Sequence, residues 1–220
     1  MHFIYVFTAK KLTVEKTTAP KALPAMEGLA FGQHFSDHML QADWEPEGGW
    51  GAPRITPYGP LAIEPAAAVL HYAVECFEGM KAYKDAKGQI RLFRPDCNVA
   101  RLNDSMARLH LPGVDEAAFL ATLGELIKLD ERWIPEGDGY SLYLRPTAIA
   151  TDPYLGLGIC NNVKLFVFTC PVGPYYPTGF KPIKLLADAE NVRAWPGGCG
   201  ASKVSNRATD QYHLRLNSQV

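Results

Sequence analysis

The sequence lacks the features that mark several large classes of protein. Its 220 residues contain no apolar run long enough to span a bilayer, because runs such as 3–7 and 165–168 are only a few residues long. It also has no surplus of charge: 22 Lys and Arg residues oppose 23 Asp and Glu residues, for a formal net charge of -1. We therefore expect neither a membrane nor a nucleic acid as a partner, and a small-molecule enzyme fits this balance.

The cysteines and histidines form no pattern of a known site. The five cysteines are odd in number, widely spaced and without a C-x-x-C pair, unlike a disulfide framework or a zinc site. The six histidines are scattered, and His34 and His38 are the one pair with helical spacing, in a segment rich in turn-forming residues. We expect reduced thiols and no bound metal.

Common catalytic and targeting motifs are absent as well. The sequence has no G-x-G-x-x-G, P-loop, H-E-x-x-H or G-x-S-x-G. A secretory signal is not expected, because the apolar residues 3–7 precede Lys10 and Lys11, which reverses the signal order. The first arginine is Arg54, which disfavours an Arg-rich mitochondrial leader. The cytosol is the expected compartment, with the mitochondrion as the alternative.

Hydrophobic patterning predicts helices and strands that do not alternate strictly, which is an α+β organisation. The expected helices are a short, largely buried one from Pro65 to about Gly79, one from Pro95 to before Pro112, and one from an N-cap at Asp115 to before Pro135. The expected strands are near 12–15 and 35–44, in a hairpin of 80–84 and 89–93, and at 141–150, 163–169 and 184–187. A dense Pro and Gly segment after Cys170 predicts a domain boundary.

Three short strings carry polar groups that could act together. The string F-E-G-M-K-A-Y begins at Phe77, where the first predicted helix meets the hairpin. In S-L-Y-L-R-P, residues 141–146, Tyr143 and Arg145 project from the same side of a strand because side chains alternate along it. The third string, R-A-W-P-G-G-C-G-A-S-K, ends at Lys203 after a glycine-rich approach. Taken alone, none of the three defines a reaction.

In order and spacing, these strings resemble the eukaryotic-type branched-chain amino acid aminotransferases. R-L-F-R-P and C-P-V-G-P-Y match too, and the resemblance runs from about Lys11 to Val204. It implies a fold type IV pyridoxal 5'-phosphate enzyme, with a small N-terminal α+β domain (here 1–170), a linker (171–181) and a larger barrel-like domain (beginning at 182–220), assembled as a homodimer. The implied reaction transfers the amino group of leucine, isoleucine or valine to 2-oxoglutarate.

The resemblance also implies roles for particular residues. Lys203 corresponds to the lysine that carries the cofactor and moves the substrate proton, for which its amine must be deprotonated. Arg101 corresponds to the arginine that binds the cofactor phosphate, a task that suits a guanidinium with its parallel donors. Arg145 would recognise the distal carboxylate of glutamate or 2-oxoglutarate. The substrate pocket would be lined by Phe31, Tyr72, Phe77, Tyr143, Arg145 and Tyr175, with Leu155 and Leu157 reaching in from the second subunit.

The resemblance ends after Val204. Where the family continues with two glycines, an asparagine and a tyrosine that bonds the cofactor, this chain reads S-N-R-A-T-D from Ser205 and ends at Val220. The acidic partner of the pyridine nitrogen and most of the phosphate ligands would be missing. We therefore expect a C-terminal truncation with a divergent tail from about residue 205, weak cofactor binding and little transaminase activity.

Three other interpretations stay open. The chain could be another fold type IV enzyme, a D-amino acid aminotransferase or an aminodeoxychorismate lyase, although the string at 141–146 favours the branched-chain group. It could instead be a noncatalytic fragment that associates with intact subunits. It could also be an artefact of a gene model with a shifted reading frame or a retained intron.

Overall fold

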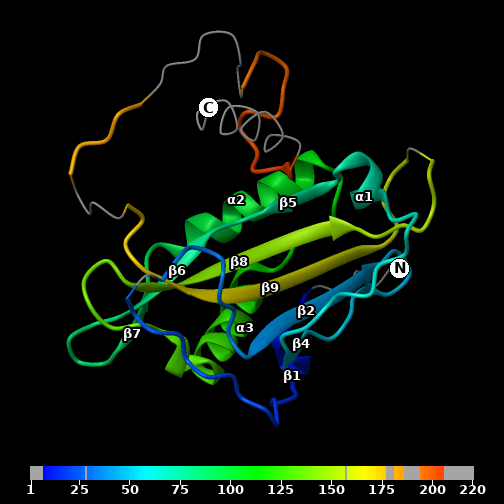
Figure 1. The fold of residues 1–220 in the computed structure, drawn as a ribbon. Coiled ribbons are helices and arrows are strands. Elements are labelled where there is room, and N and C mark those ends of the chain that lie inside the picture. Colours follow the sequence, from blue (N-terminus) through cyan, green and yellow to red (C-terminus); the bar gives the residue numbers. More distant parts are fainter. Residues whose placement is uncertain (1–6, 28, 157, 177–180, 186–193, 206–220) are drawn as a thin grey trace.

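One sheet runs through the part of the chain that the computed structural model describes, residues 7–27, 29–156, 158–176, 181–185 and 194–205 (Figure 1). Its strands are β1 Thr13–Val14, β2 His38–Glu45, β3 Gly49–Trp50, β4 Arg54–Pro57, β5 Glu75–Phe77, β6 Met80–Lys84, β7 Ile90–Leu92, β8 Ser141–Ala150 and β9 Val163–Val172. They follow the order β1-β4-β2-β9-β8-β6-β7, with β3 beside β2 and β5 beside β8. The pairing of β1 with β4 is parallel, whereas β8 and β9 pair in antiparallel fashion.

The centre of the sheet is the long pair of β8 and β9. Its register runs from Ser141 opposite Val172 to Ala150 opposite Val163, and most of these residues are buried. The β-branched, aliphatic and aromatic side chains of both strands suit such a pleated, covered surface. The predicted strand at 141–150 is confirmed, and the predicted strand at 163–169 continues three residues further to Val172.

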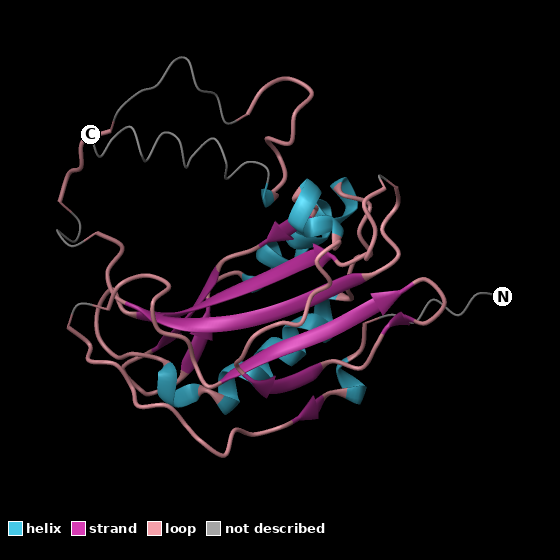
Figure 2. Cartoon of the chain, turned by 45° about the vertical axis from the view of Figure 1, so that its right-hand side comes forward, coloured by secondary structure: helices cyan, strands magenta, loops and turns pink. Residues whose placement is uncertain are grey.

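Two helices cover one face of this sheet (Figure 1, Figure 2). Helix α2, Pro95–Arg108, begins with proline at its first turn, and helix α3, Glu116–Leu129, begins after Asp115. The Asp115 carboxylate accepts a hydrogen bond from the Ala118 N–H at 2.8 Å, which satisfies a donor that has no partner inside the helix. Both predicted helices and the predicted N-cap are confirmed.

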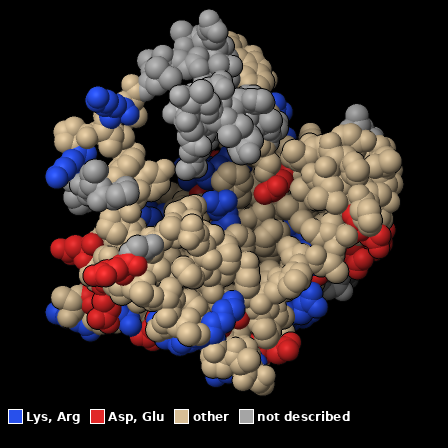
Figure 3. Space-filling view, viewed as in Figure 1, with Lys and Arg blue, Asp and Glu red and all other residues tan. Residues whose placement is uncertain are grey.

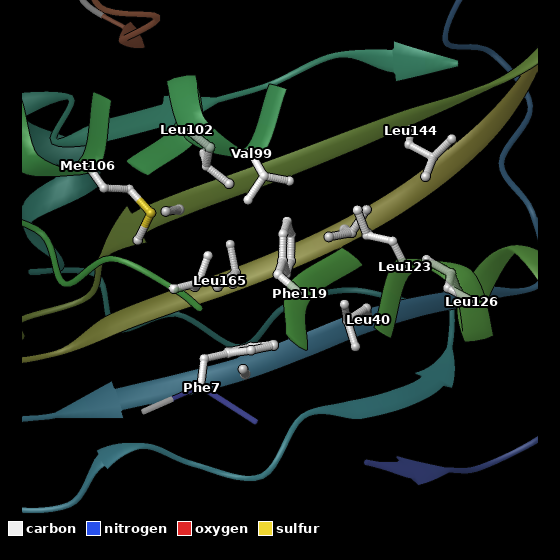
Figure 4. Packing of buried hydrophobic residues seen from close by; sticks show 14 of the residues in the cluster. Phe7, Leu40, Val99, Leu102, Met106, Phe119, Leu123, Leu126, Leu144 and Leu165 are labelled. Atoms are coloured by element: carbon white, nitrogen blue, oxygen red, sulfur yellow. The ribbon is translucent and has the colours of Figure 1, made fainter. Parts of the chain in front are cut away.

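The hydrophobic core lies between these helices and the sheet (Figure 4). Val99, Leu102 and Met106 of α2 have no exposed surface, and they recur on one face at helical spacing. Phe119 of α3 is equally buried, and its ring meets the ring of Phe7 edge to face at a centroid distance of 5.7 Å. One continuous core therefore joins the start of the described chain to both helices.

The helix predicted from Pro65 to about Gly79 is wrong in length and in burial. Helix α1 spans only Ala68–Tyr72, and most of its side chains are exposed, with Leu70 at 60%. Ala73 ends it in the left-handed region at φ 51°, and β5 then pairs with β8. Strand pairing satisfies the backbone of these residues, so the sheet overrides their helix propensity. The predicted hairpin that follows is confirmed by the pairing of β6 with β7.

The strand predicted at 184–187 is absent from the two residues of this range that the structure describes. Lys184 and Leu185 are described and lie outside any strand, whereas residues 186 and 187 lie outside the described residues.

Within the described ranges, no helix is both long and apolar enough to cross a membrane. In those ranges no group of His, Cys, Asp and Glu is arranged to hold a metal ion, and the ring of His38 contacts Asp130 at 2.7 Å instead.

A buried carboxylate joins the N-terminal segment to the short 3-10 helix Glu131–Trp133, which follows α3. Asp37 accepts hydrogen bonds from the Lys21 N–H at 2.9 Å, from Trp133 Nε1 at 2.9 Å and from Arg132 Nη2 at 2.6 Å. Burial raises the pKa of Asp37, but these hydrogen bonds and the Arg132 charge outweigh burial and hold the pKa below its usual range. The ionised form of Asp37 is therefore part of the folded structure.

Acid is expected to destabilise the fold in part through Asp37. Because the folded-state pKa is lowered, its contribution is present above the unfolded-state pKa of roughly 3.9 and is lost as the pH falls through the folded value. Urea unfolding from neutral pH to about pH 3 should show a shallower loss of stability for Asp37→Asn than for wild type. Asp138→Asn, at an exposed position, is the control. Equal pH slopes for wild type and Asp37→Asn would contradict this role.

Candidate active site

The corner between β5 and β6 is the centre of the candidate site. Residues 77–79 turn against β8, where the Glu78 N–H donates to the Pro146 carbonyl at 2.8 Å. The Phe77 N–H donates to the carbonyl of Lys203 at 3.1 Å, so a residue from far along the chain closes over the corner. The first and third strings of the sequence therefore meet here.

Lys203 is held by its backbone between β5 and α2. Its N–H donates to Ser105 Oγ of α2 at 2.9 Å, and its neighbour Val204 forms an antiparallel bridge with Cys76 of β5. The side chain is half-buried, and its Nζ atom lies 4.8 Å from the centroid of the Phe77 ring. This contact is a cation–π interaction when the amine is protonated, and it sets the amine beside an apolar surface.

The approach to Lys203 depends on its glycines. A turn spans residues 195–198, closed by the Gly198 N–H donating to the Trp195 carbonyl at 3.0 Å. Pro196 and Gly197, with φ 80° at Gly197, occupy the central positions that a type II turn assigns to proline and glycine. A Cβ on Gly200 would lie 2.7 Å from that of Ala194. Residues 194–203 thus form a loop that ends at the lysine.

Arg101 projects from α2 toward the corner and pairs with Glu78. Its Nε and Nη2 atoms donate to the two Glu78 oxygens at 2.5 and 2.8 Å, while Asn98 Nδ2 donates to Glu78 at 2.9 Å. Burial raises the pKa of Glu78, but the Arg101 hydrogen bonds, then those of Asn98 and the Gly79 N–H, lower it below its usual range. The pair is ionised, with the carboxylate fully buried and the guanidinium side chain 52% exposed.

Arg145 and Tyr143 face the same corner from β8, as the strand alternation predicts. The Arg145 Nη2 and Nε atoms donate to the Tyr143 hydroxyl at 3.1 and 3.3 Å. The Arg145 guanidinium also lies over the Phe77 ring at 4.6 Å, and Phe31 meets the Tyr143 ring edge to face at 4.9 Å. Five predicted site residues therefore lie together at this corner: Phe31, Phe77, Tyr143, Arg145 and Lys203.

Gly79 leaves the space that the Tyr143 hydroxyl occupies. A Cβ built on Gly79 would lie 2.0 Å from the Tyr143 Oη atom and 2.8 Å from Cζ, which is closer than real contacts allow. Because the backbone of Gly79 is not in the left-handed region, this contact is the reason that the position favours glycine. The same Tyr143 hydroxyl accepts the hydrogen bonds from Arg145.

Gly79→Ala is expected to cost about 1–3 kcal/mol of unfolding free energy, as overpacking commonly does. The cost should shrink in a Tyr143→Leu background, because the displaced hydroxyl and ring atoms are absent there. Urea unfolding of both single variants and the double variant gives the coupling energy, expected at about 0.5–3 kcal/mol. Additive costs of the two substitutions would show that Tyr143 is not the group displaced.

The remaining predicted pocket residues lie apart from this group or are not described. Tyr72 donates its hydroxyl to the carbonyl of Leu155 of the same chain, and Leu155 itself is 60% exposed. Tyr175 is 77% exposed and meets Tyr176 edge to face. Leu157 lies outside the described residues.

Sequence reasoning missed the residues that position these groups. Glu78, Gly79, Asn98 and Ser105 were not assigned roles, although Glu78 and Gly79 stand inside the first string. One signal was available: Glu78 lies between the apolar stretch that contains Cys76 and the predicted strand at 80–84. A carboxylate that is buried in such a position needs a cationic partner. The partner itself could not be found from spacing, because it lies 23 residues away on α2.

Basic side chains, with acidic atoms beside them, border a hollow on this face of the molecule (Figure 3). Arg101, Arg145 and Lys203 supply three cationic groups in the described site, and the Glu78 carboxylate that pairs with Arg101 is buried. Such an arrangement attracts an anion and gives it several charge-assisted donors. The site therefore suits a small anionic molecule with an apolar part.

Three curated relatives of the chain share one name, branched-chain-amino-acid aminotransferase. No protein-family model matches the chain. The chain is 53% identical over 202 residues to the branched-chain-amino-acid aminotransferase of Dictyostelium discoideum, covering 91% of this chain and 53% of that protein. It is 49% identical over 197 residues to the cytosolic enzyme of that name from Saccharomyces cerevisiae, covering 89% of this chain and 52% of that protein. It is 44% identical over 201 residues to the mitochondrial enzyme of that name from Mus musculus, covering 90% of this chain and 51% of that protein. The chain spans about half the length of these relatives.

Solved structures show the same fold. A branched-chain aminotransferase of the archaeon Thermoproteus uzoniensis, solved with norvaline, matches with a TM-score of 0.60 at 17% identity, over 80% of this chain and 55% of that chain. A second branched-chain amino acid aminotransferase structure gives 0.60 at 20% identity, over 80% and 53%. The described part of the chain thus has the α+β fold of the fold type IV enzymes. The chain is a homologue of the branched-chain-amino-acid aminotransferases, which confirms the resemblance predicted from its strings.

Proposed function

We propose that this site serves a pyridoxal-phosphate-dependent transaminase, which moves the amino group of leucine, isoleucine or valine to 2-oxoglutarate. The observation that carries the proposal is the convergence of the Lys203 amine and the Arg145 guanidinium on one ring, 4.8 and 4.6 Å from the centroid of Phe77. The names of the relatives support the reaction. Solved branched-chain aminotransferase structures with pyridoxamine 5'-phosphate and N-(5'-phosphopyridoxyl)-L-glutamate support the cofactor.

The described residues fit such a cofactor. An aldehyde needs an amine, and Lys203 is fixed by its backbone so that its half-buried side chain lies at the site. A phosphate needs charged donors, and Glu78 uses only two of the five N–H groups of Arg101, whose side chain is half exposed. When bound, the cofactor supplies the electron sink for carbon–hydrogen cleavage next to the amino group.

The chain's own residues would then take separate roles in proton transfer and in substrate binding. The deprotonated Nζ atom of Lys203 takes the proton from the substrate α-carbon, as a general base. The rings of Phe31 and Phe77 offer apolar surface to a branched aliphatic side chain, whereas Arg145, oriented by Tyr143, offers a fork of donors to a distal carboxylate. One pocket can in this way accept both an aliphatic amino acid and glutamate.

The domain division, the partner and the compartment are proposed as well. We assign residues 1–170 to the small domain, 171–181 to the linker and 182–220 to the beginning of the larger domain; β9 continues to Val172, two residues past the proposed boundary. A second copy of the chain would cover exposed apolar groups such as Leu155, at 60%, and Ile159, at 75%. Cys76, Cys97, Cys160 and Cys170 are free thiols, which suits a reducing compartment such as the cytosol.

A single-turnover assay tests the proposed reaction. Protein loaded with pyridoxal phosphate is incubated separately with L-leucine and D-alanine, and the 2-oxo acid formed is measured by mass spectrometry. We expect a small yield of the 2-oxo acid of leucine, in keeping with the weak activity expected from the divergence after Val204, and no product from Lys203→Arg. Conversion of D-alanine alone would instead favour a D-amino acid aminotransferase. Cofactor attachment to Lys203 without conversion of either substrate would favour a noncatalytic role.

A further inference from the structure

A fully buried carboxylate lies beneath the most exposed cation of the site. The Glu78 side chain has no exposed surface, although charged residues are rarely buried without strong compensation. Its compensation comes from three sources: the Arg101 guanidinium, Asn98 Nδ2 at 2.9 Å and the Gly79 N–H at 3.1 Å. Every one of these donors belongs to α2 or to the corner itself.

The geometry fixes how Arg101 is turned. Both Glu78 oxygens accept from one edge of the guanidinium, through Nε at 2.5 Å and Nη2 at 2.8 Å. A bidentate pair of this kind defines the plane of the guanidinium, which a single hydrogen bond would leave free to rotate. Because the carboxylate is buried and the Arg101 side chain is 52% exposed, the remaining N–H groups lie on the edge away from the protein interior.

The positions of Arg101 and Lys203 are also linked through α2. Ser105 stands one helical turn after Arg101 and accepts the Lys203 N–H at 2.9 Å. Asn98, one turn before Arg101, holds both Glu78 and the Gly79 carbonyl, the latter at 3.2 Å. One stretch of helix therefore sets the amine, the guanidinium and the carboxylate relative to one another.

We propose that Glu78 is a positioning residue, which holds the Arg101 guanidinium so that its outward N–H groups receive the phosphate of the cofactor. This inference rests on the proposed function, since it assumes that an aldehyde bearing a phosphate binds at Lys203. Fixing the guanidinium in advance removes an ordering cost that a mobile arginine would incur on binding. Glu78 thereby favours the anion although it carries a negative charge itself.

The sign of the effect separates positioning from simple charge. If Glu78 acted on the phosphate only through its charge, neutralising it would strengthen binding, because an uncompensated Arg101 attracts an anion more. If Glu78 positions Arg101, neutralising it weakens binding of the phosphate and leaves the aldehyde contact unchanged. Comparing pyridoxal phosphate with pyridoxal, which lacks the phosphate, isolates this contribution.

The experiment measures dissociation constants of both molecules by absorbance titration of the full chain. For Glu78→Gln we expect about fivefold to tenfold weaker binding of pyridoxal phosphate, in line with the ordering cost of one immobilised side chain. Binding of pyridoxal should stay within about twofold of wild type. Glu75→Gln, on neighbouring β5, is the matched control and should change neither constant.

Two further arms keep the outcome decisive. If circular dichroism shows that Glu78→Gln does not fold, Asn98→Ala is measured instead, with an expected loss of about twofold for pyridoxal phosphate alone, since it removes one of the supporting donors. Unchanged or tighter binding of pyridoxal phosphate in the folded variant would overturn the positioning role and leave the proposed function standing. Failure of wild type to attach either molecule at Lys203 would overturn both.

Discussion

Replacing Lys203 by arginine is expected to abolish covalent attachment of pyridoxal phosphate. Arginine keeps the positive charge and much of the length of the side chain, so the cation–π contact with Phe77 can persist. It cannot supply a neutral amine, however, because a guanidinium stays protonated at every accessible pH. Spectroscopic titration with the cofactor should therefore show the absorbance change of covalent attachment in wild type and none in the variant.

A second lysine controls for nonspecific reaction of the aldehyde. Lys184 is exposed and lies in the same part of the chain, so Lys184→Arg should behave like wild type. Residual phosphate binding at Arg101 in Lys203→Arg is expected, since the Glu78 pair does not involve the lysine. An undiminished absorbance change in Lys203→Arg would place the reactive amine elsewhere and refute the assignment.

Truncating Phe119 to alanine is expected to be the most destabilising single change in the core. The ring has no exposed surface and contacts the Phe7 ring edge to face, so its removal leaves a cavity between α3, the sheet and the start of the described chain. Phenylalanine to alanine changes in cores cost about 3–5 kcal/mol, against a total stability of about 5–15 kcal/mol for a domain. Urea unfolding followed by circular dichroism measures the difference.

Phe93 provides the matched control for this change. It is the same residue type but 74% exposed, at the connection from β7 to α2. Phe93→Ala should change the unfolding free energy by no more than about 0.5 kcal/mol. If both variants lost similar stability, the core would not be centred on the two helices and the sheet as described.

Local patterns were sufficient to predict the helices α2 and α3 and the central strands. Each has a local sequence signal: proline at the start of α2, the Asp115 carboxylate before α3, and a long run of strand-forming residues in β8. That Tyr143 and Arg145 project from the same side of β8 followed from alternation, whereas the hydrogen bond between them did not. These features are determined by residues close together in the sequence, which a single sequence displays directly.

Long-range contacts were beyond such reasoning. The stretch 65–79 has the composition of a helix, yet the sheet recruits β5 from it through pairing with residues about 70 positions later. The partners of Glu78 and the Ser105 contact to Lys203 are likewise set by packing. The divergence expected after Val204, with the weak activity expected from it, stays a prediction, because residues 206–220 lie outside the described residues.

The most direct test is to identify the lysine that the cofactor modifies. The full chain is mixed with one equivalent of pyridoxal phosphate, reduced with borohydride, digested and mapped by mass spectrometry. We expect the phosphopyridoxyl group on the peptide containing Lys203, with the exposed lysines such as Lys184 largely unmodified. A label spread evenly over the surface lysines, with none enriched at Lys203, would contradict the site proposed at the corner of β5 and β6.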